Sequence, residues 1–395
     1  MRLLFLADAV FEDLPGGAQT VAQELAAGLA TLGHSVTFLV GRHNTSAPDR
    51  EEQGGIEIVR YPGAGQGMEF VRQGRQAAAR LWTEKPFDLI HTHFAYAAVG
   101  PKQAIPRTVP RVRTFHGPWD EEGWLEDTQG NMSQTTRIKA MARKQIRARI
   151  ERRDLAGSDR VLTLSDCFRQ IVTQRFSVKM ERTETIAGGV DTVRFKPPQD
   201  KAQVKRELGL PSNWPLLLSI RRLAPRMGLD RLIAAMPGIL AHHPEALLLI
   251  GGKGPDRERL ERLITQTGLA NHVRLLGFIS QENLAAYYRA SDLFVLPTLA
   301  LEGFGLVTTE ALACGLPVIG TPIGATPEIL GALDPRLISP DTTSAGLASA
   351  IHSFFAGNWR ESLSPECLHS FFLNRYSWEK NVQATEKVYH SLIKY

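Results

Sequence analysis

The chain has 395 residues, of which 43% are apolar and 22% charged, and a formal net charge of +5. This length predicts two domains, because single hydrophobic cores rarely grow beyond about 250–300 residues. The small positive excess is shared along the chain without a basic domain, so we expect no nucleic acid as a partner. The three cysteines (Cys167, Cys314 and Cys367) lack the spacing of a metal site or a disulfide framework, which indicates a reducing cytoplasm.

Short apolar runs alternate with helical patterns along the whole chain. The first eight residues predict a strand rather than a signal segment, and no apolar run is long enough for a membrane span. Continuous apolar runs of this kind are typical of buried parallel strands. We expect them at residues 3–7, 36–40, 89–93, 112–115 and 161–164, and again at 216–220, 247–250, 273–276, 293–296 and 318–319.

The helical segment 19–32 places its apolar residues on one face, and Gly33 is suited to end it. Strand and helix alternating with right-handed crossovers predict a doubly wound α/β sheet, and the pattern occurs twice. A Gly- and Pro-rich stretch near residues 187–198 separates the two copies. We therefore expect two Rossmann-like domains, 1–187 and 188–375, that face a central cleft, with a C-terminal helix over 376–395 packing back toward the first.

Three features of the first half, one glycine and two histidine segments, follow predicted strands, at the edge where doubly wound sheets bind ligands. Gly17 follows Gly16 after the first strand and fits either a tight turn or the close approach of a phosphate to bare backbone. His116 follows the strand 112–115 and precedes a glycine, so it fits either a structural or a functional histidine. His91 and His93 could suggest a metal pair, but no third ligand with suitable spacing is visible, and we expect no metal.

A predicted helix over residues 136–154 carries eight Lys or Arg side chains between Arg137 and Arg153, with only Glu151 opposing them. At 100° per residue the charges spread around the whole circumference, and no clean apolar stripe emerges. A solvated helix is the simple interpretation. The alternative is weak peripheral contact of the 137–153 helix with an anionic membrane surface, or with an anionic acceptor.

Cations follow the first strand of the second half. Arg222 and Arg226 lie in the loop after residues 216–220, where guanidinium groups could neutralise the charge on a departing diphosphate. The alternative is that these arginines form ion pairs on the protein surface, which would fit the same sequence. The chain contains no Asp-x-Asp, which favours fixed guanidinium groups over a metal-bound diphosphate. Phe278 ends another strand and could stack near a nucleotide base or pack in the core.

The most informative stretch runs from Pro297 to Leu330. Glu302 and Glu310 bracket a Gly-Phe-Gly turn that opens a helix, and such a turn can direct backbone N–H groups at a phosphate. On a continuous helix the two acids would be about 12 Å apart. That spacing matches a sugar nucleotide, with one acid at the sugar hydroxyls and the other at the ribose hydroxyls.

These residues resemble glycosyltransferase family 4, the retaining nucleotide-sugar enzymes of the GT-B fold, over nearly the whole chain. The resemblance rests on the order and spacing of the Glu302–Glu310 element, the segment Gly277-Phe-Ile-Ser, the Gly-Val-Asp of the linker, Phe115-His-Gly and the early Gly-Gly.

The resemblance implies a role for each site residue. Glu310 would bind the ribose hydroxyls and Glu302 would lie near the donor sugar. Gly303, Phe304, Gly305 and Leu306 would present backbone to the sugar and diphosphate. Arg222 would contact the diphosphate, His116 the donor sugar and Gly17 the phosphates. A nucleotide sugar is then the donor substrate, and no cofactor is expected.

One departure from the family affects the diphosphate contacts. The family commonly has Lys immediately before the glycine that corresponds to Gly228, whereas this chain has Met227. Arg226 could supply the second cation instead. The sequence does not identify the residues that bind the acceptor, so the acceptor could be a glycan, a glycolipid or a small molecule.

The expected reaction is hexosyl transfer with retention to an acceptor hydroxyl, without a metal, in the synthesis of a cell-surface polysaccharide or glycoconjugate. A nucleotide-sugar epimerase or a phosphorylase on the same fold is the main alternative. A nicotinamide dehydrogenase would need the G-x-G-x-x-G fingerprint, which is missing. A non-catalytic carbohydrate- or nucleotide-binding protein is the third alternative.

Overall fold

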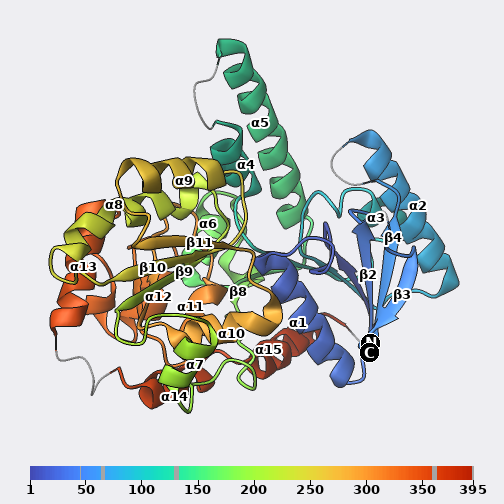
Figure 1. The fold of residues 1–395 in the computed structure, drawn as a ribbon. Helices are drawn as coiled ribbons and strands as arrows, with labels where there is room; N and C mark the ends of the chain where they lie inside the picture. Colours follow the sequence, from blue (N-terminus) through green and yellow to red (C-terminus); the bar gives the residue numbers. More distant parts are fainter. Residues whose placement is uncertain (45, 64–66, 129–132, 358–362, 394–395) are drawn as a thin grey trace. The chain divides into compact units, whose positions relative to one another are not determined.

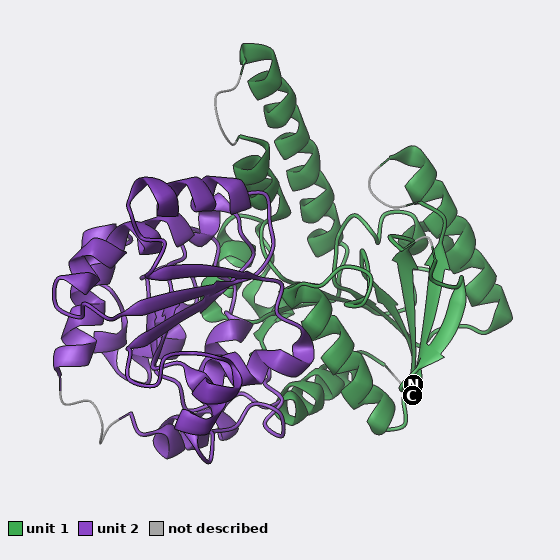
Figure 2. Cartoon of the chain, viewed as in Figure 1, with its two compact units in different colours: residues 1–188, 378–395 green, residues 189–377 purple. Residues whose placement is uncertain are grey.

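The computed structural model describes residues 1–44, 46–63, 67–128, 133–357 and 363–393 (Figure 1). The chain forms two compact units, drawn in green and purple in Figure 2. Unit 1 comprises residues 1–188 and 378–395, and unit 2 comprises residues 189–377. The boundary predicted at 187/188 lies one residue from the division at 188/189, and the last helix belongs to unit 1. No helix in the described ranges is both long and apolar enough to cross a membrane.

Unit 1 is built on an eight-stranded sheet with the order β3-β4-β2-β1-β5-β6-β7-β8. All neighbouring strands are parallel except β3 and β4. The strands are β1 (Arg2–Leu6), β2 (Ser35–Gly41), β3 (Arg50–Gln53), β4 (Ile56–Tyr61), β5 (Leu89–Thr92), β6 (Arg111–Phe115), β7 (Arg160–Thr163) and β8 (Thr183–Thr185). Every strand predicted in this half is present, and β3, β4 and β8 are additional.

The helices of unit 1 follow its strands along the chain. They are α1 (Gly17–Thr31), α2 (Met68–Glu84), α3 (Pro101–Ala104), α4 (Trp119–Asp127), α5 (Gln134–Ala156), α6 (Asp166–Gln174) and α15 (Trp378–Leu392), with the 3-10 turn η1 (Met180–Arg182). The C-terminal helix α15 packs against α1, and Val382, Val388 and Tyr389 are buried in the same core as Leu25 and Leu29. Burial of each such side chain contributes about 1.5–3 kcal/mol.

Unit 2 contains a five-stranded, fully parallel sheet with the order β11-β10-β9-β12-β13. The strands are β9 (Leu216–Ile220), β10 (Leu247–Gly251), β11 (Val273–Gly277), β12 (Leu293–Leu296) and β13 (Val318–Gly320). The helices are α7 (Lys201–Glu207), α8 (Leu229–Leu240), α9 (Arg257–Gln266), α10 (Gln281–Ala290), α11 (Leu306–Ala313), α12 (Thr326–Gly331), α13 (Ser344–Ala356) and α14 (Pro365–Leu373), with η2 (Pro225–Met227) and η3 (Pro335–Leu337).

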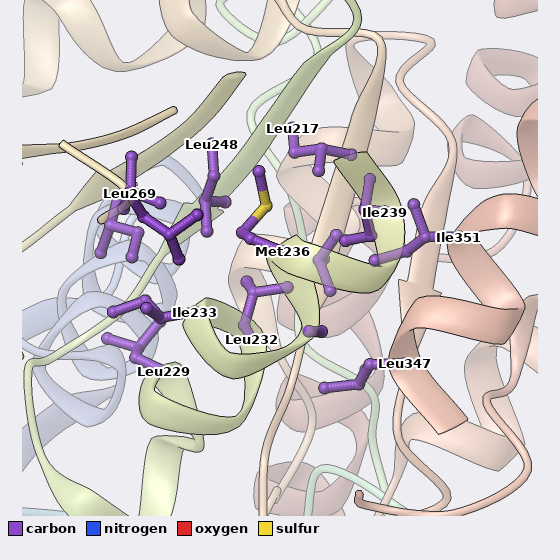
Figure 3. Packing of buried hydrophobic residues seen from close by; sticks show 14 of the residues in the cluster. Leu217, Leu229, Leu232, Ile233, Met236, Ile239, Leu248, Leu269, Leu347 and Ile351 are labelled. Carbon is purple, nitrogen blue, oxygen red and sulfur yellow. The ribbon is translucent and has the colours of Figure 1, made fainter. Parts of the chain in front are cut away.

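One face of the unit 2 sheet is covered by α8 and α13. Leu232, Ile233, Met236 and Ile239 on α8 are buried in one core cluster with β9, β10 and α13. Figure 3 shows these α8 side chains among residues of the other elements, including Leu217. Strands buried in this way carry continuous apolar sequence, which is why their positions could be predicted.

Both sheets have the strand order of a doubly wound fold, so the predicted fold class is confirmed. In unit 2 the order reverses between β9 and β12, which pair in parallel through Leu217–Leu293 and Leu218–Phe294. The loops that leave the carboxyl ends of these two strands lie at the topological switch point, where α/β sheets bind ligands. In unit 1 the corresponding strands are β1 and β5.

Candidate active site

The loop from β12 to α11 contains the most constrained backbone of unit 2. Leu301 adopts a left-handed conformation (φ 61°), which is unfavourable for a residue with a branched side chain. Gly305 precedes α11 with φ 82°, a conformation that glycine adopts without strain. The helix begins at Leu306, so Glu302 lies in the loop and not on the helix. The turn opens a helix as predicted, but the helical rise used to place the two acids about 12 Å apart does not apply to the loop residues 302–305.

Glu302 is held by two side chains at the switch point. Its Oε2 lies 2.8 Å from Nη2 of Arg221, which directly follows β9. The same oxygen accepts a hydrogen bond of 2.8 Å from the hydroxyl of Thr298, and Nη1 of Arg221 donates to that hydroxyl over 2.8 Å. The side chains of Arg221 and Glu302 are only 7% and 9% exposed. This is a buried ion pair that fixes the orientation of the carboxylate.

The loops after β9 and β12 are also tied together through their backbones. Gly228 has φ 70°, and a Cβ there would lie 1.8 Å from the carbonyl oxygen of Pro297, so only glycine fits. The backbone N–H of Leu299 donates to the carbonyl of Arg226 over 2.9 Å. The two loops therefore form one unit, and a shift in one would displace the other.

The two predicted cations differ in their surroundings. The Arg222 side chain is exposed, directly after the buried Arg221. Arg226 is partly buried and donates through Nη1 to the carbonyl of Leu301 over 3.2 Å, which supports the strained loop. Met227, where the family has Lys, is buried beside the Arg221 guanidinium, with Sδ 2.9 Å from Nη2. The contacts of Arg222 and Arg226 with a diphosphate stay predictions.

Glu310 lies in the middle of α11, where Tyr288 of α10 donates a hydrogen bond of 2.8 Å to its Oε2. Burial raises the pKa of Glu310 to about 7, although the hydrogen bond from Tyr288 partly opposes this change. A carboxyl group with this pKa is poised between its two protonation states near neutral pH. It would favour a ligand that donates hydrogen bonds, such as a pair of hydroxyls.

The pKa of Glu310 predicts a specific pH dependence of stability. Because folding raises this pKa from the ordinary 4.5, the favourable contribution of the protonated side chain is complete below pH 4.5 and is lost as the pH rises toward 7. At about 1.4 kcal/mol per pH unit, the loss is on the order of 3–4 kcal/mol. We expect Glu310→Gln to remove this loss, so that the variant gains stability relative to wild type at pH 8 but not at pH 4.

Urea unfolding of both proteins at the two pH values measures this effect. The exposed Glu282 on α10 provides a control, since Glu282→Gln should leave the pH dependence unchanged. If Glu310→Gln and wild type lose the same free energy of unfolding between pH 4 and pH 8, the perturbed pKa is contradicted.

Two predicted aromatic contacts differ in burial. Phe278 follows β11 at the carboxyl edge of the sheet, is 51% exposed, and carries the ammonium of Lys253 4.9 Å above its ring. An exposed ring at a strand end is available to a base, and the structure excludes the alternative that Phe278 packs in the core. Phe304 is 5% exposed and packs edge-on against Tyr376, so its ring belongs to the interior of unit 2.

The predicted residues of unit 1 lie at the ends of β1 and β6. Gly17 is the first residue of α1, and Gly16 before it provides no side-chain cap. The first N–H groups of a helix have no partner within the helix, so the start of α1 can receive an anion. Nearby, Gln19 donates to Asp8 over 2.9 Å, and burial raises the pKa of Asp8.

His116 is partly accessible and lies next to the buried His91 and His93. Its Nε2 lies 3.1 Å from Nδ1 of His93, and burial lowers the pKa of His116 to about 3. His116 is therefore neutral at physiological pH and can act as a hydrogen-bonding group but not as a cation. His91 is fully buried between Tyr389 and Thr114, which makes it a structural residue. In the described part of the chain, no three His, Cys, Asp or Glu side chains are grouped to hold a metal ion.

The structure thus gathers Glu302, the 303–306 turn and Arg226 at one switch point in unit 2, and Arg222 belongs to the same loop after β9 as Arg226. Sequence reasoning missed the residues that hold the two acids, namely Arg221, Thr298 and Tyr288. The available signal was that Arg221 and Arg222 both directly follow a buried strand. Nothing in the sequence indicated which of the two adjacent arginines turns inward.

Two family models match consecutive parts of the chain. The model described as Glycosyltransferase Family 4 matches residues 15–194, and the model described as Glycosyl transferases group 1 matches residues 200–365. The chain belongs to the family 4 glycosyltransferases. The protein is therefore a glycosyltransferase.

Similar proteins extend over the whole of this glycosyltransferase. An uncharacterized glycosyltransferase of Methanocaldococcus jannaschii is 26% identical over 389 residues, which cover 95% of this chain and 94% of that one. The GDP-mannose-dependent monoacylated alpha-(1-6)-phosphatidylinositol monomannoside mannosyltransferase of Corynebacterium glutamicum is 39% identical over 153 residues, or 37% and 40% of the two chains. The structure of sucrose-phosphate synthase from Thermosynechococcus elongatus superposes with a TM-score of 0.82 at 25% identity, over 99% of both chains. The glycosyltransferase accordingly has the two-domain GT-B fold.

Proposed function

We propose that this glycosyltransferase moves a hexosyl group from a nucleotide diphosphate sugar to an acceptor hydroxyl with retention of the anomeric configuration. The observation that supports this most directly is the arrangement of unit 2, where a buried acid, a guanidinium-rich loop and an open helix N-terminus meet at the topological switch point. These three features suit an anionic diphosphate and a polyhydroxyl group bound side by side.

The donor would lie along the loops of unit 2. Glu310 binds the ribose hydroxyls, and the exposed ring of Phe278 lies near the base. Arg222 contacts the diphosphate together with the backbone N–H groups of the 303–306 turn. Glu302 faces the hydroxyls of the transferred sugar.

Arg226 supports the loop and adds positive charge beside the diphosphate. Unit 1 would contribute Gly17 at the phosphates and the neutral imidazole of His116 at the sugar. No metal and no cofactor take part in the proposed reaction.

In the proposed reaction the bond between the anomeric carbon and the diphosphate oxygen breaks, and a bond to the acceptor oxygen forms on the same face of the sugar. The leaving phosphate accepts the proton of the acceptor hydroxyl. Arg222 and the amides at the start of α11 stabilise the charge that grows on the diphosphate, which lowers the barrier to its departure.

A thermal-shift panel of UDP-, GDP- and ADP-sugars, followed by mass spectrometry of products formed with candidate acceptors, tests the proposed function. We expect one nucleotide series to stabilise the protein, and NMR of the product to show the donor's anomeric configuration. Conversion of the donor without any acceptor would favour an epimerase instead, and an inverted product would contradict retention.

The charges of the basic helix α5 are an argument for a membrane-associated acceptor of this enzyme. The structure divides its charges between two faces: Arg143 and Arg147 pair with Asp127, and Glu151 pairs with the buried Arg113. The other side of the helix exposes cations without any acid of α5 among them. The residues exposed there include Ile138, Met141, Ile146, Arg149, Arg152 and Arg153.

We propose that this outward face binds the anionic cytoplasmic leaflet, so that the enzyme works peripherally on a lipid-linked acceptor in glycoconjugate or polysaccharide synthesis. Cations and large apolar side chains on one exposed helix face are typical of interfacial helices. The mannosyltransferase relative of Corynebacterium glutamicum is named for a phosphatidylinositol acceptor, which agrees with this proposal.

Charge reversal tests the outward face of α5. Each cation near an anionic bilayer contributes about 1 kcal/mol, so Arg149→Glu combined with Arg152→Glu should weaken sedimentation with phosphatidylserine vesicles by at least about 30-fold. Arg257→Glu with Arg262→Glu on α9 is the matched control, because both side chains are about half exposed or more, at 49% and 64%, on a surface helix of unit 2. Equal sedimentation of the two double variants, or no sedimentation of wild type, would contradict the membrane contact.

A further inference from the structure

Thr308 lies in the first turn of α11 with its side chain buried at 1% exposure. Its hydroxyl Oγ1 is enclosed and has no hydrogen-bond partner among the residues that the structure describes. Buried hydroxyls are normally paired, because leaving one unpaired costs free energy. The hydroxyl therefore indicates a partner that comes from outside the protein.

The neighbouring residue shows the ordinary arrangement. Thr309 is equally buried, and its Oγ1 donates to the carbonyl of Leu306 over 2.8 Å within the helix. The backbone N–H of Thr308 is also used, since it donates to the carbonyl of Gly305 over 2.8 Å. Of these three donor groups, the hydroxyl of Thr308 is the one that lacks a hydrogen-bond partner within the described residues.

The direction of this hydroxyl is defined by Gly305. A Cβ on Gly305 would lie 3.1 Å from Oγ1 of Thr308 and 3.5 Å from Oε1 of Glu302. Because residue 305 is glycine, no side chain fills that position. Both oxygens therefore border the same space at the N-terminus of α11.

Glu302 presents one particular oxygen to this space. Arg221 and Thr298 both bind Oε2, which leaves Oε1 on the side of Gly305. A carboxylate oxygen only accepts hydrogen bonds, whereas a threonine hydroxyl both donates and accepts. Directly beside Oε1 a phosphate oxygen would be repelled, whereas a ligand hydroxyl can donate to Oε1 and accept from Thr308. The diphosphate is proposed instead on the backbone N–H groups of the 303–306 turn.

We propose that Thr308 is a specificity-determining residue that binds, together with Oε1 of Glu302, one hydroxyl of the transferred sugar. The proposal rests on the donor site proposed above and adds to it a residue and a hydrogen-bonding role. Thr308 distinguishes donors by the presence of this hydroxyl, because an analogue without it leaves both oxygens unpaired.

Thr308→Val tests the proposal, since it replaces the hydroxyl by a methyl group of nearly the same size. Thr309→Val is the matched control from the same helix turn. Binding to UDP-glucose, GDP-mannose, UDP and GDP is measured by calorimetry, with sugar nucleotides that lack the 2-, 3-, 4- or 6-hydroxyl as further probes. If Thr308→Val does not fold, Thr308→Ala and Thr308→Ser replace it, the serine variant retaining the hydroxyl.

We expect Thr308→Val to weaken binding of the preferred nucleotide sugar about 3- to 10-fold and to leave binding of the matching nucleoside diphosphate unchanged. For one of the deoxy donors, wild type and Thr308→Val should bind equally. Unchanged binding of the nucleotide sugar by Thr308→Val would overturn the proposal, and so would an equal loss with the diphosphate alone. A wild-type protein that binds no nucleotide sugar at all would instead refute the proposed function, and the inference with it.

Discussion

Replacement of Arg222 by alanine is expected to lower turnover by about 10²–10³-fold. Arg222 is exposed in the loop after β9, beside the ion pair that holds Glu302. In the proposed reaction its guanidinium lies against the diphosphate as negative charge develops there. Removal of one fixed donor from such a charge costs about 2.7–4 kcal/mol of transition-state stabilisation.

The kinetic constants distinguish this role from simple donor binding. An interaction that strengthens in the transition state lowers kcat and kcat/KM together, whereas loss of uniform binding raises KM alone. Steady-state kinetics with the identified donor measure both constants. Arg231→Ala is the control, because Arg231 is exposed on α8. If Arg222→Ala keeps the wild-type kcat, Arg222 does not contact the leaving group.

Replacement of Arg221 by methionine is expected to destabilise the protein by about 3–5 kcal/mol. The guanidinium of Arg221 and the carboxylate of Glu302 are both buried and lie 2.8 Å apart. Removal of one partner leaves the other charge buried without compensation, and this penalty exceeds the value of an exposed pair several-fold. Urea unfolding of the full chain measures the change.

A second substitution separates the ion pair from simple packing. Arg221→Met combined with Glu302→Gln removes both charges and should recover most of the lost stability. Arg259→Met is the comparison, since Arg259 also pairs with acids but its side chain is 44% exposed, so a loss below about 1 kcal/mol is expected. A double variant as unstable as Arg221→Met would show that the charges are not the cause.

The strands and the fold class could be predicted because the physical signal is local. The strand at 216–220, like the others in the sheet centres, is buried on both faces. A strand buried on both faces has a continuous apolar sequence, which can be recognised without the structure. The strand β3 was missed because it lies at the sheet edge and Arg50–Gln53 is polar. The neighbouring β4 was missed because its burial largely alternates over Ile56–Tyr61, so it has no continuous apolar run. The three-residue β8 is too short to give a pattern.

The site was harder to predict because its details depend on contacts between distant segments. Arg221 and Arg222 are adjacent in sequence, and successive side chains that leave a strand point in opposite directions. Only the loop after β12, about 77 residues later along the chain, decides which one is buried. The start of α11 after the Gly-Phe-Gly turn was predicted, but the left-handed conformation of Leu301 in the preceding loop could not be recognised from the sequence.

The charges of α5 illustrate the same limit. Its cations spread around the helix in sequence, and no stripe could be recognised. The acids that pair with one face come from other elements, as Asp127 of α4 does with Arg147. The tertiary structure is therefore needed to separate the cations that stabilise the fold from those that are exposed on the opposite face.

A crystal structure of the protein with its nucleotide diphosphate sugar tests the central claim most directly. The account predicts phosphate oxygens within hydrogen-bonding distance of the backbone N–H groups at the start of α11 and of the Arg222 guanidinium, with the ribose on Glu310. Phosphates bound away from the start of α11 and from the loop after β9 would contradict it.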